Sequence, residues 1–193
     1  MEEKTPGILL HSFSYLGQKK ILKVLTQDHG LLTFMAKSAR FPTTPFCIAE
    51  WVFLKGQKEI YSLTDATLLD PLLELRQDYK VLSSAAILAQ DLLQTQMPNK
   101  KGPFHLACAF FKKLSLNPDI LGASFRLKLL LYEGLLSADR DPAFSLSEWE
   151  QVSILAFGDR FSQILEVKQV PFGKIKMLFD ERFGRCTERD SNP

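Results

Sequence analysis

The sequence predicts an α+β protein with a five-stranded OB-type β-barrel at the N-terminus followed by an all-helical C-terminal domain. In the first seventy residues, glycines separate short runs rich in β-branched and aromatic residues, which is typical of a small antiparallel barrel. From Pro71 onward, apolar residues recur at steps of three and four, which is typical of helices. We therefore expect an OB-fold domain at 1–70, whose function the charged residues below address, and a helical domain at 71–193.

Turn signals separate the strands that we predict. The segment Asp28-His29-Gly30 is typical of a tight turn, because glycine adopts a left-handed backbone at little cost. The second and third strands should therefore form a hairpin. The five predicted strands are 8–16, 20–26, 31–37, 46–54 and 59–63.

The longest predicted helix lies between Pro71 and Pro98, a stretch without internal glycine or proline. We expect one apolar stripe along it, made of Leu75, Tyr79, Leu82, Ala86, Ala89 and Leu93.

A capping residue before a proline, Asn117-Pro118, predicts the start of another helix, which should end at Gly134. It is apolar on more than one face, so we expect it to be the central, most buried helix. The remaining helices are predicted at 104–116, after a cap at Ser145 or Ser147, at 159–167 and after Gly173.

Composition excludes several classes of protein. The net charge of +2 is too balanced to indicate a nucleic-acid partner by itself. No run of eighteen apolar residues occurs and the N-terminus is polar and acidic, so we expect a cytoplasmic protein without a membrane partner. The three cysteines are far apart and form no Cys-x-x-Cys pair, which disfavours a disulfide framework or a zinc knuckle.

Catalytic patterns are missing from the sequence. His11, His29 and His105 have no metal-ligand spacing, and neither a Gly-x-Ser-x-Gly elbow nor a Gly-x-Gly-x-x-Gly loop is present. We therefore expect no catalytic residue, no bound metal and no cofactor, and we predict that the protein is not an enzyme.

Basic residues gather at one end of the predicted hairpin. Lys19, Lys20 and Lys23 surround the start of the second strand, while Lys37 and Arg40 follow the third. A tight hairpin brings these ends together, so the five cations should form one patch that attracts DNA phosphates. The aromatic residues that could stack unpaired bases beside it are Phe13, Tyr15, Phe34 and Phe41.

A second interpretation of these residues stays open. Lysines at strand ends also keep a sheet edge soluble, and the aromatic residues could simply fill the barrel. Further along, Arg126 and Lys128 interrupt the very apolar third helix, where a cation must reach the surface or a partner. The last helix carries an apolar stripe flanked by cations, which fits either a core-facing helix or a site for an acidic, apolar peptide.

Three stretches resemble the RecO family of bacterial recombination mediators. The first runs from Gly7-Ile8-Leu9-Leu10-His11 through the turn ending at Gly30 to Ala36-Lys37-Ser38-Ala39-Arg40. The second is Phe125-Arg126-Leu127-Lys128-Leu129-Leu130, closed by Glu133-Gly134, and the third is Lys174-Ile175-Lys176-Met177-Leu178-Phe179. Their order and their spread over nearly the whole chain make the resemblance more specific than any one of them.

The resemblance implies an OB fold joined to a helical domain and a role in DNA repair. It implies binding of single- and double-stranded DNA, annealing of complementary strands, and loading of the recombinase together with RecR and the single-stranded-DNA-binding protein. By motif, Lys37 and Arg40 would contact DNA. Arg126 and Lys128 would lie where some members receive the acidic tail of the single-stranded-DNA-binding protein.

Departures from the family pattern bear on these expectations. Ser38 replaces a usual glycine, and the loop 41–45 lacks the arginines and lysines often found there, whereas Gln18-Lys19-Lys20 adds positive charge. The segment 137–147 contains no cysteine, so the zinc module of some members is not expected. An alternative is therefore a protein-interaction adaptor of the repair machinery with little DNA binding of its own.

Overall fold

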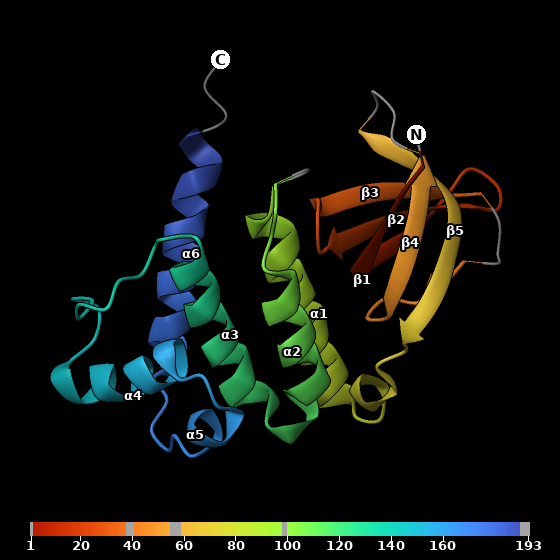
Figure 1. The fold of residues 1–193 in the computed structure, drawn as a ribbon. Coiled ribbons are helices and arrows are strands. Elements are labelled where there is room, and N and C mark those ends of the chain that lie inside the picture. The colour runs from red at the N-terminus through yellow and green to blue at the C-terminus, as the bar shows by residue number, and fades with distance from the viewer. Residues whose placement is uncertain (1, 38–40, 55–58, 98–99, 190–193) are drawn as a thin grey trace. The chain divides into compact units, whose positions relative to one another are not determined.

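The computed structural model describes residues 2–37, 41–54, 59–97 and 100–189, and its chain begins as a closed β-barrel (Figure 1). The strands are β1 (Glu2–Tyr15), β2 (Lys19–Thr26), β3 (Gly30–Ala36), β4 (Ile48–Leu54) and β5 (Ile60–Asp70). They close in the order β1-β2-β3-β5-β4, with β3 and β5 parallel and the other pairs antiparallel. A barrel followed by helices confirms the predicted fold class.

Strand alternation decides which side chains fill the barrel. Phe34 of β3 and Trp51 and Phe53 of β4 are fully buried inside it, and the rings of Phe34 and Trp51 stack with centroids 6.0 Å apart. The Trp51 indole Nε1 donates a hydrogen bond to the Gly7 carbonyl at 3.0 Å. A Cβ atom at Gly7 would lie 2.6 Å from Val24 Cγ1, so only glycine allows β1 this close to the core.

The predicted hairpin between β2 and β3 is confirmed. Gly30 has a φ of +67°, and the Thr26 hydroxyl donates to the Gly30 carbonyl at 2.7 Å. The register pairs Thr26 with Gly30 and Lys20 with Ala36. The start of β2 therefore lies beside the end of β3, as the sequence predicted.

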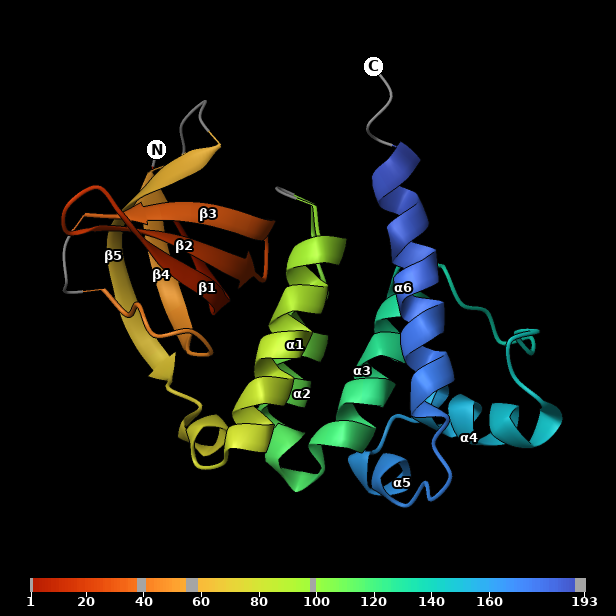
Figure 2. The same cartoon turned by 180° about the vertical axis from the view of Figure 1, so that it is seen from behind.

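In the described part of the chain, six α-helices follow the barrel. Figure 2 shows them from behind. Asn117 and Ser145 cap α3 and α4 as expected, and Ser145 forms a capping box with Glu148. The helices are α1 (Tyr79–Thr95), α2 (Phe104–Lys113), α3 (Pro118–Tyr132), α4 (Leu146–Phe157), α5 (Phe161–Leu165) and α6 (Phe172–Arg189), with short 3-10 helices at Leu73–Arg76 and Leu114–Leu116.

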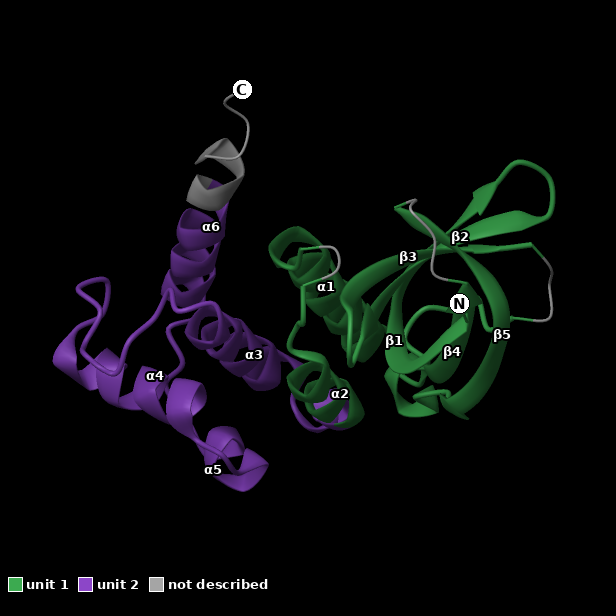
Figure 3. Ribbon diagram, turned by 45° about the horizontal axis from the view of Figure 1, so that its top comes forward, with its two compact units in different colours: residues 1–112 green, residues 113–193 purple. Residues whose placement is uncertain are grey.

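The chain forms two compact units, residues 1–112 and 113–193 (Figure 3). Helices α1 and α2 belong with the barrel, because α1 contacts β1 and the Phe111 ring of α2 lies 5.8 Å from that of Phe46. In the second unit, α3 contacts α4, α5 and α6, so it is the central helix that the sequence predicted. The division into separate domains at residue 70 stays a prediction.

The predicted apolar stripe of the first helix is wrong for most of its length. Tyr79 begins α1 with 86% of its surface exposed, and Ala86 is also exposed. The buried stripe lies one residue earlier along the helix. Each predicted residue from Leu82 onward follows another apolar residue, so the sequence contains two parallel stripes and only packing selects one. Of the predicted stripe, Leu75 and Ala89 are buried as expected. The buried residues of α1 are Val81, Ala85, Leu88, Ala89, Asp91 and Leu92.

None of the helices in the described part of the chain is both long and apolar enough to cross a membrane.

Candidate nucleic-acid interface

One outer surface of the barrel gathers basic and aromatic side chains, and we call it the β1–β3 outer face. Residues directly opposite each other on neighbouring strands point to the same side. The register places Tyr15 opposite Lys19, Phe13 opposite Ile21, and His11 opposite Lys23. On the other side of β2, Ile21 lies opposite Met35 and Lys23 opposite Thr33. This face consists of His11, Phe13, Tyr15, Lys19, Ile21, Lys23, Thr33 and Met35.

Two aromatic rings of this face are open to solvent. Phe13 is 42% exposed and Tyr15 is 44% exposed, whereas Phe34 and Phe41 are buried in the barrel core. Phe34 and Phe41 therefore fill the barrel, whereas base stacking on Phe13 and Tyr15 stays a prediction. Phe13 and Tyr15 present ring faces on which unpaired bases could stack, because stacking needs a planar apolar surface and no particular base.

A hollow of about 540 Å³ lies on this face. Its wall includes the half-exposed rings, the Lys23 side chain and the Glu59 side chain next to β5. A pocket of this size suits a group as large as a nucleobase. The residues that line it are Phe13, Tyr15, Ile21, Lys23, Leu31, Leu32, Thr33, Met35, Glu59, Ile60 and Tyr61.

The lysines of β2 divide between the two sides of the strand. Lys19 and Lys23 lie on the outer face, and neither ammonium group pairs with another residue in the described part of the chain. Lys20 alternates with them, on the side of the core residue Leu22, and its Nζ donates to the Thr43 hydroxyl at 3.0 Å. Lys20 therefore contacts the segment that follows β3 and does not share the outer face with Lys19 and Lys23.

The other two predicted contacts lie beyond β3. Lys37 is exposed and follows Ala36 directly, so it lies at the same end of the sheet as Lys19 and Lys20. Arg40 lies outside the described residues. The structure thus brings Lys19, Lys20 and Lys37 to one end of the sheet, with Lys23 further along the outer face.

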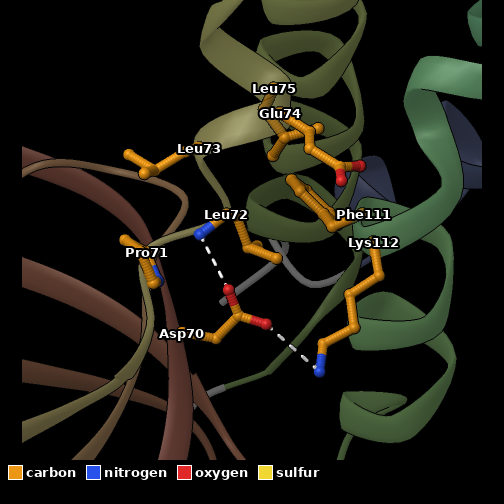
Figure 4. Close-up of a pocket in the computed structure, with 8 residues that line it drawn as sticks. All are labelled: Asp70, Pro71, Leu72, Leu73, Glu74, Leu75, Phe111 and Lys112. Carbon is orange, nitrogen blue, oxygen red and sulfur yellow. Dashed lines mark hydrogen bonds and ion pairs between the residues drawn. The ribbon is translucent and has the colours of Figure 1, made fainter.

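A second hollow, of about 400 Å³, lies where β5 leads into the first helix (Figure 4). Two of its charged groups are paired, since Lys112 Nζ lies 3.2 Å from an Asp70 carboxylate oxygen. The other Asp70 oxygen accepts from the Leu72 backbone N–H at 2.9 Å. The polar contacts of Asp70 stabilise the turn after β5, so this hollow has a structural explanation, unlike the hollow on the β1–β3 outer face.

The cations of α3 are engaged within the second unit. Lys128 Nζ donates to the carbonyls of Ala156 at 3.1 Å and Gly158 at 2.6 Å, at the C-terminal end of α4. Burial lowers the pKa of Lys128, and the Asp159 carboxylate opposes that shift. The Arg126 guanidinium lies 5.5 Å from the centre of the Phe179 ring. Both side chains therefore contact other residues of the second unit, and do not simply extend to the surface.

Several residues that line the hollow were not predicted from the sequence. Met35 and Ile60 contribute apolar surface, and Glu59 contributes a carboxylate. Period-two alternation along β3 would have placed Met35 with Thr33, but the residues that face them from β5 depend on the parallel pairing of Thr33 with Ile60. Such pairing between distant strands has no local sequence signal.

A closed five-stranded barrel with a basic, aromatic outer face defines this protein as an OB-type barrel protein. Residues 1–72 match the family model described as "Recombination protein O N terminal". The chain belongs to the RecO family.

Curated relatives of this chain are named "DNA repair protein RecO". The protein from Chlamydia pneumoniae is 31% identical over 151 residues, covering 72% of this chain and 59% of that protein. The one from Caldicellulosiruptor bescii is 28% identical over 142 residues, covering 68% of this chain and 58% of that protein. The protein from Chlamydia trachomatis serovar L2 is 25% identical over 169 residues, covering 81% of this chain and 69% of that protein. The chain thus spans less than two thirds of the first two relatives.

Proposed function

We propose that this protein acts in DNA repair as a non-enzymatic mediator that binds DNA through the β1–β3 outer face. One observation carries the proposal. On that face, two lysines without a partner among the described residues flank two half-exposed aromatic rings. Positive charge interleaved with stacking surfaces is the combination that single-stranded nucleic acid requires.

The charges suggest how a strand would lie. Phosphates would follow Lys19 and Lys23, and bases would stack on Phe13 and Tyr15 in the hollow. The Glu59 carboxylate at its wall repels phosphate, which favours a base there. Stacking leaves the hydrogen-bonding edges of the bases free, so a strand held this way can pair with its complement. This arrangement supports annealing of single strands.

The wider role rests on family membership and on the names of the relatives. We propose that the protein binds single- and double-stranded DNA and works with RecR and the single-stranded-DNA-binding protein in loading the recombinase. The acidic tail of that binding protein would meet the helical unit near Arg126 and Lys128. Because both cations have intramolecular contacts, the tail would have to bind beside them or replace those contacts.

A salt titration tests the DNA-contact proposal. We expect the affinity for a labelled single-stranded oligonucleotide to fall as salt rises, by about 0.7 units of log affinity per unit of log salt for each phosphate neutralised. Replacing both Lys19 and Lys23 with alanine should reduce the slope by about 1.4 units. Lys4→Ala is the matched control, since Lys4 is on β1 opposite Val52 of β4, away from this face, and pairs with Glu50.

The same titration separates DNA binding from the adaptor alternative. No binding at low salt, or an unchanged slope in the double variant, would contradict the proposal. An adaptor would bind an acidic, phenylalanine-ending peptide yet fail to accelerate annealing of complementary oligonucleotides. A mediator should accelerate annealing, and the double variant should slow it.

A further inference from the structure

The turn between β1 and β2 has a residue that its backbone does not favour. Leu16 has a φ of 26° and Gly17 a φ of 70°, so two successive residues are left-handed. The turn has three residues between the paired Tyr15 and Lys19, and a positive φ is adopted at low cost by glycine, asparagine or aspartate. A leucine there is strained because its Cβ crowds the backbone, and strain of this sort is retained at sites where the side chain has a use.

Packing within the barrel does not explain the leucine. Leu16 is 73% exposed, the most exposed of the large apolar residues in the barrel strands and their turns that the structure describes. A Cβ atom added at Gly17 would meet no described atom within 4 Å. The tip of this hairpin is therefore open, and burial does not compensate for the strain at Leu16.

The surroundings of the tip indicate the kind of ligand. Phe13 and Tyr15, the half-exposed rings, precede Leu16 on the same strand, and Lys19 lies directly opposite Tyr15. An exposed apolar tip beside lysines favours a ligand that is both anionic and stacked. Nucleic acid combines these properties, and apolar side chains such as leucine are known to insert between its base steps. If the ligand were a partner protein with an apolar pocket for Leu16, the neighbouring lysines would have no role in binding.

We propose that Leu16 is a wedge that enters between two neighbouring bases of a bound single strand and holds that step unstacked. The inference rests on the proposed DNA binding and adds a specific role for the turn. A base stacked on Tyr15 would be separated from its neighbour by the adjoining leucine. The opened step would expose base edges for pairing with a complementary strand.

The test compares Leu16→Asn with Leu16→Met in the full chain. Asparagine removes the apolar side chain and tolerates the left-handed backbone, so the variant should unfold at the same or a higher temperature than the parent protein. Methionine keeps an apolar side chain. The probe is an oligodeoxyadenosine with several 2-aminopurine bases, whose fluorescence rises when stacking is lost. Binding to oligothymidine, which is little stacked, is measured in parallel by anisotropy.

At saturation we expect the parent protein and Leu16→Met to raise 2-aminopurine fluorescence severalfold, and Leu16→Asn to leave it near the value of free DNA. Oligothymidine affinity should stay within about twofold in all three proteins. If Leu16→Asn raises the fluorescence as the parent does, or if it weakens oligothymidine binding as much as oligodeoxyadenosine binding, the wedge is wrong while the DNA-binding proposal stands. If the parent protein binds neither oligonucleotide, both are wrong.

Discussion

Both units carry basic residues on elements that are otherwise largely apolar, but the surroundings of these residues differ. On β2, Lys19 and Lys23 project from the barrel without a described partner, beside exposed rings. On α3, Lys128 donates two hydrogen bonds to the end of α4, and Arg126 lies over Phe179. Satisfied cations at a helix C-terminus stabilise the fold. Cations without an intramolecular partner, beside exposed aromatic rings, are available to a ligand. The candidate site is therefore identified by the absence of described partners for its cations, and not by positive charge alone.

The largest effect on stability should follow from Lys128→Met. The substitution leaves the carbonyls of Ala156 and Gly158 without their cationic donor, which should lower the free energy of unfolding by about 2 kcal/mol. Urea denaturation followed by circular dichroism measures it, with Lys176→Met, an exposed position on α6, as the control. An unchanged midpoint together with weakened DNA binding would mean that Lys128 serves a ligand and does not stabilise the fold.

A smaller loss is expected from Arg126→Gln. The substitution removes the cation above the Phe179 ring, a contact worth about 0.5–1 kcal/mol at a partly exposed site. Arg126→Lys retains a positive charge and should recover part of that stability in the same denaturation experiment. If both variants are as stable as the parent but bind the acidic tail peptide more weakly, Arg126 belongs to a partner site instead.

Acid should weaken the second unit through Glu148. The hydrogen bond from Lys174, at 2.7 Å, and those from Ser145 lower the pKa of Glu148 from 4.5 to about 2. A pKa lowered by folding contributes stability above pH 4.5, and this contribution is lost as pH falls toward 2. Water screens this accessible pair, so the effect is modest.

The variant Glu148→Gln isolates that contribution, because glutamine can still accept from the Ser145 backbone in the capping box. Urea midpoints at pH 6 and pH 3 should differ less in Glu148→Gln than in the parent. Glu150→Gln, at an exposed position of the same helix, should behave like the parent. Equal pH dependence in all three proteins would contradict the prediction.

The smallest effect on stability is expected at the proposed DNA-binding face. Replacing both Lys19 and Lys23 with glutamine should change the free energy of unfolding by less than about 0.5 kcal/mol, since neither side chain has a described partner to lose. Thermal unfolding of the double variant measures it. A large destabilisation would mean that these lysines hold the barrel together, and it would remove the contrast with α3.

Local signals predicted much of the fold correctly. The turn at Asp28-His29-Gly30 and the Asn117 cap each depend on a few adjacent residues, and each is confirmed. Of the two serines predicted as the next cap, the structure selects Ser145. The stripe of α1 was wrong because two apolar stripes run side by side in its sequence. On β2, alternation places Lys20 on the opposite side from Lys19 and Lys23, but both sides are partly apolar, so the sequence does not show which side faces the core.

The sequence by itself determined the class of fold, the hairpin and the presence of cations and aromatic residues near its open end, because period, turn chemistry and capping are local properties. Only the tertiary structure decided which of those residues face outward. Closure of the barrel buried Phe34 and Phe41, left Phe13, Tyr15 and Leu16 exposed, and directed Lys20 to Thr43. These outcomes depend on pairing between distant segments, which no single stretch of sequence specifies.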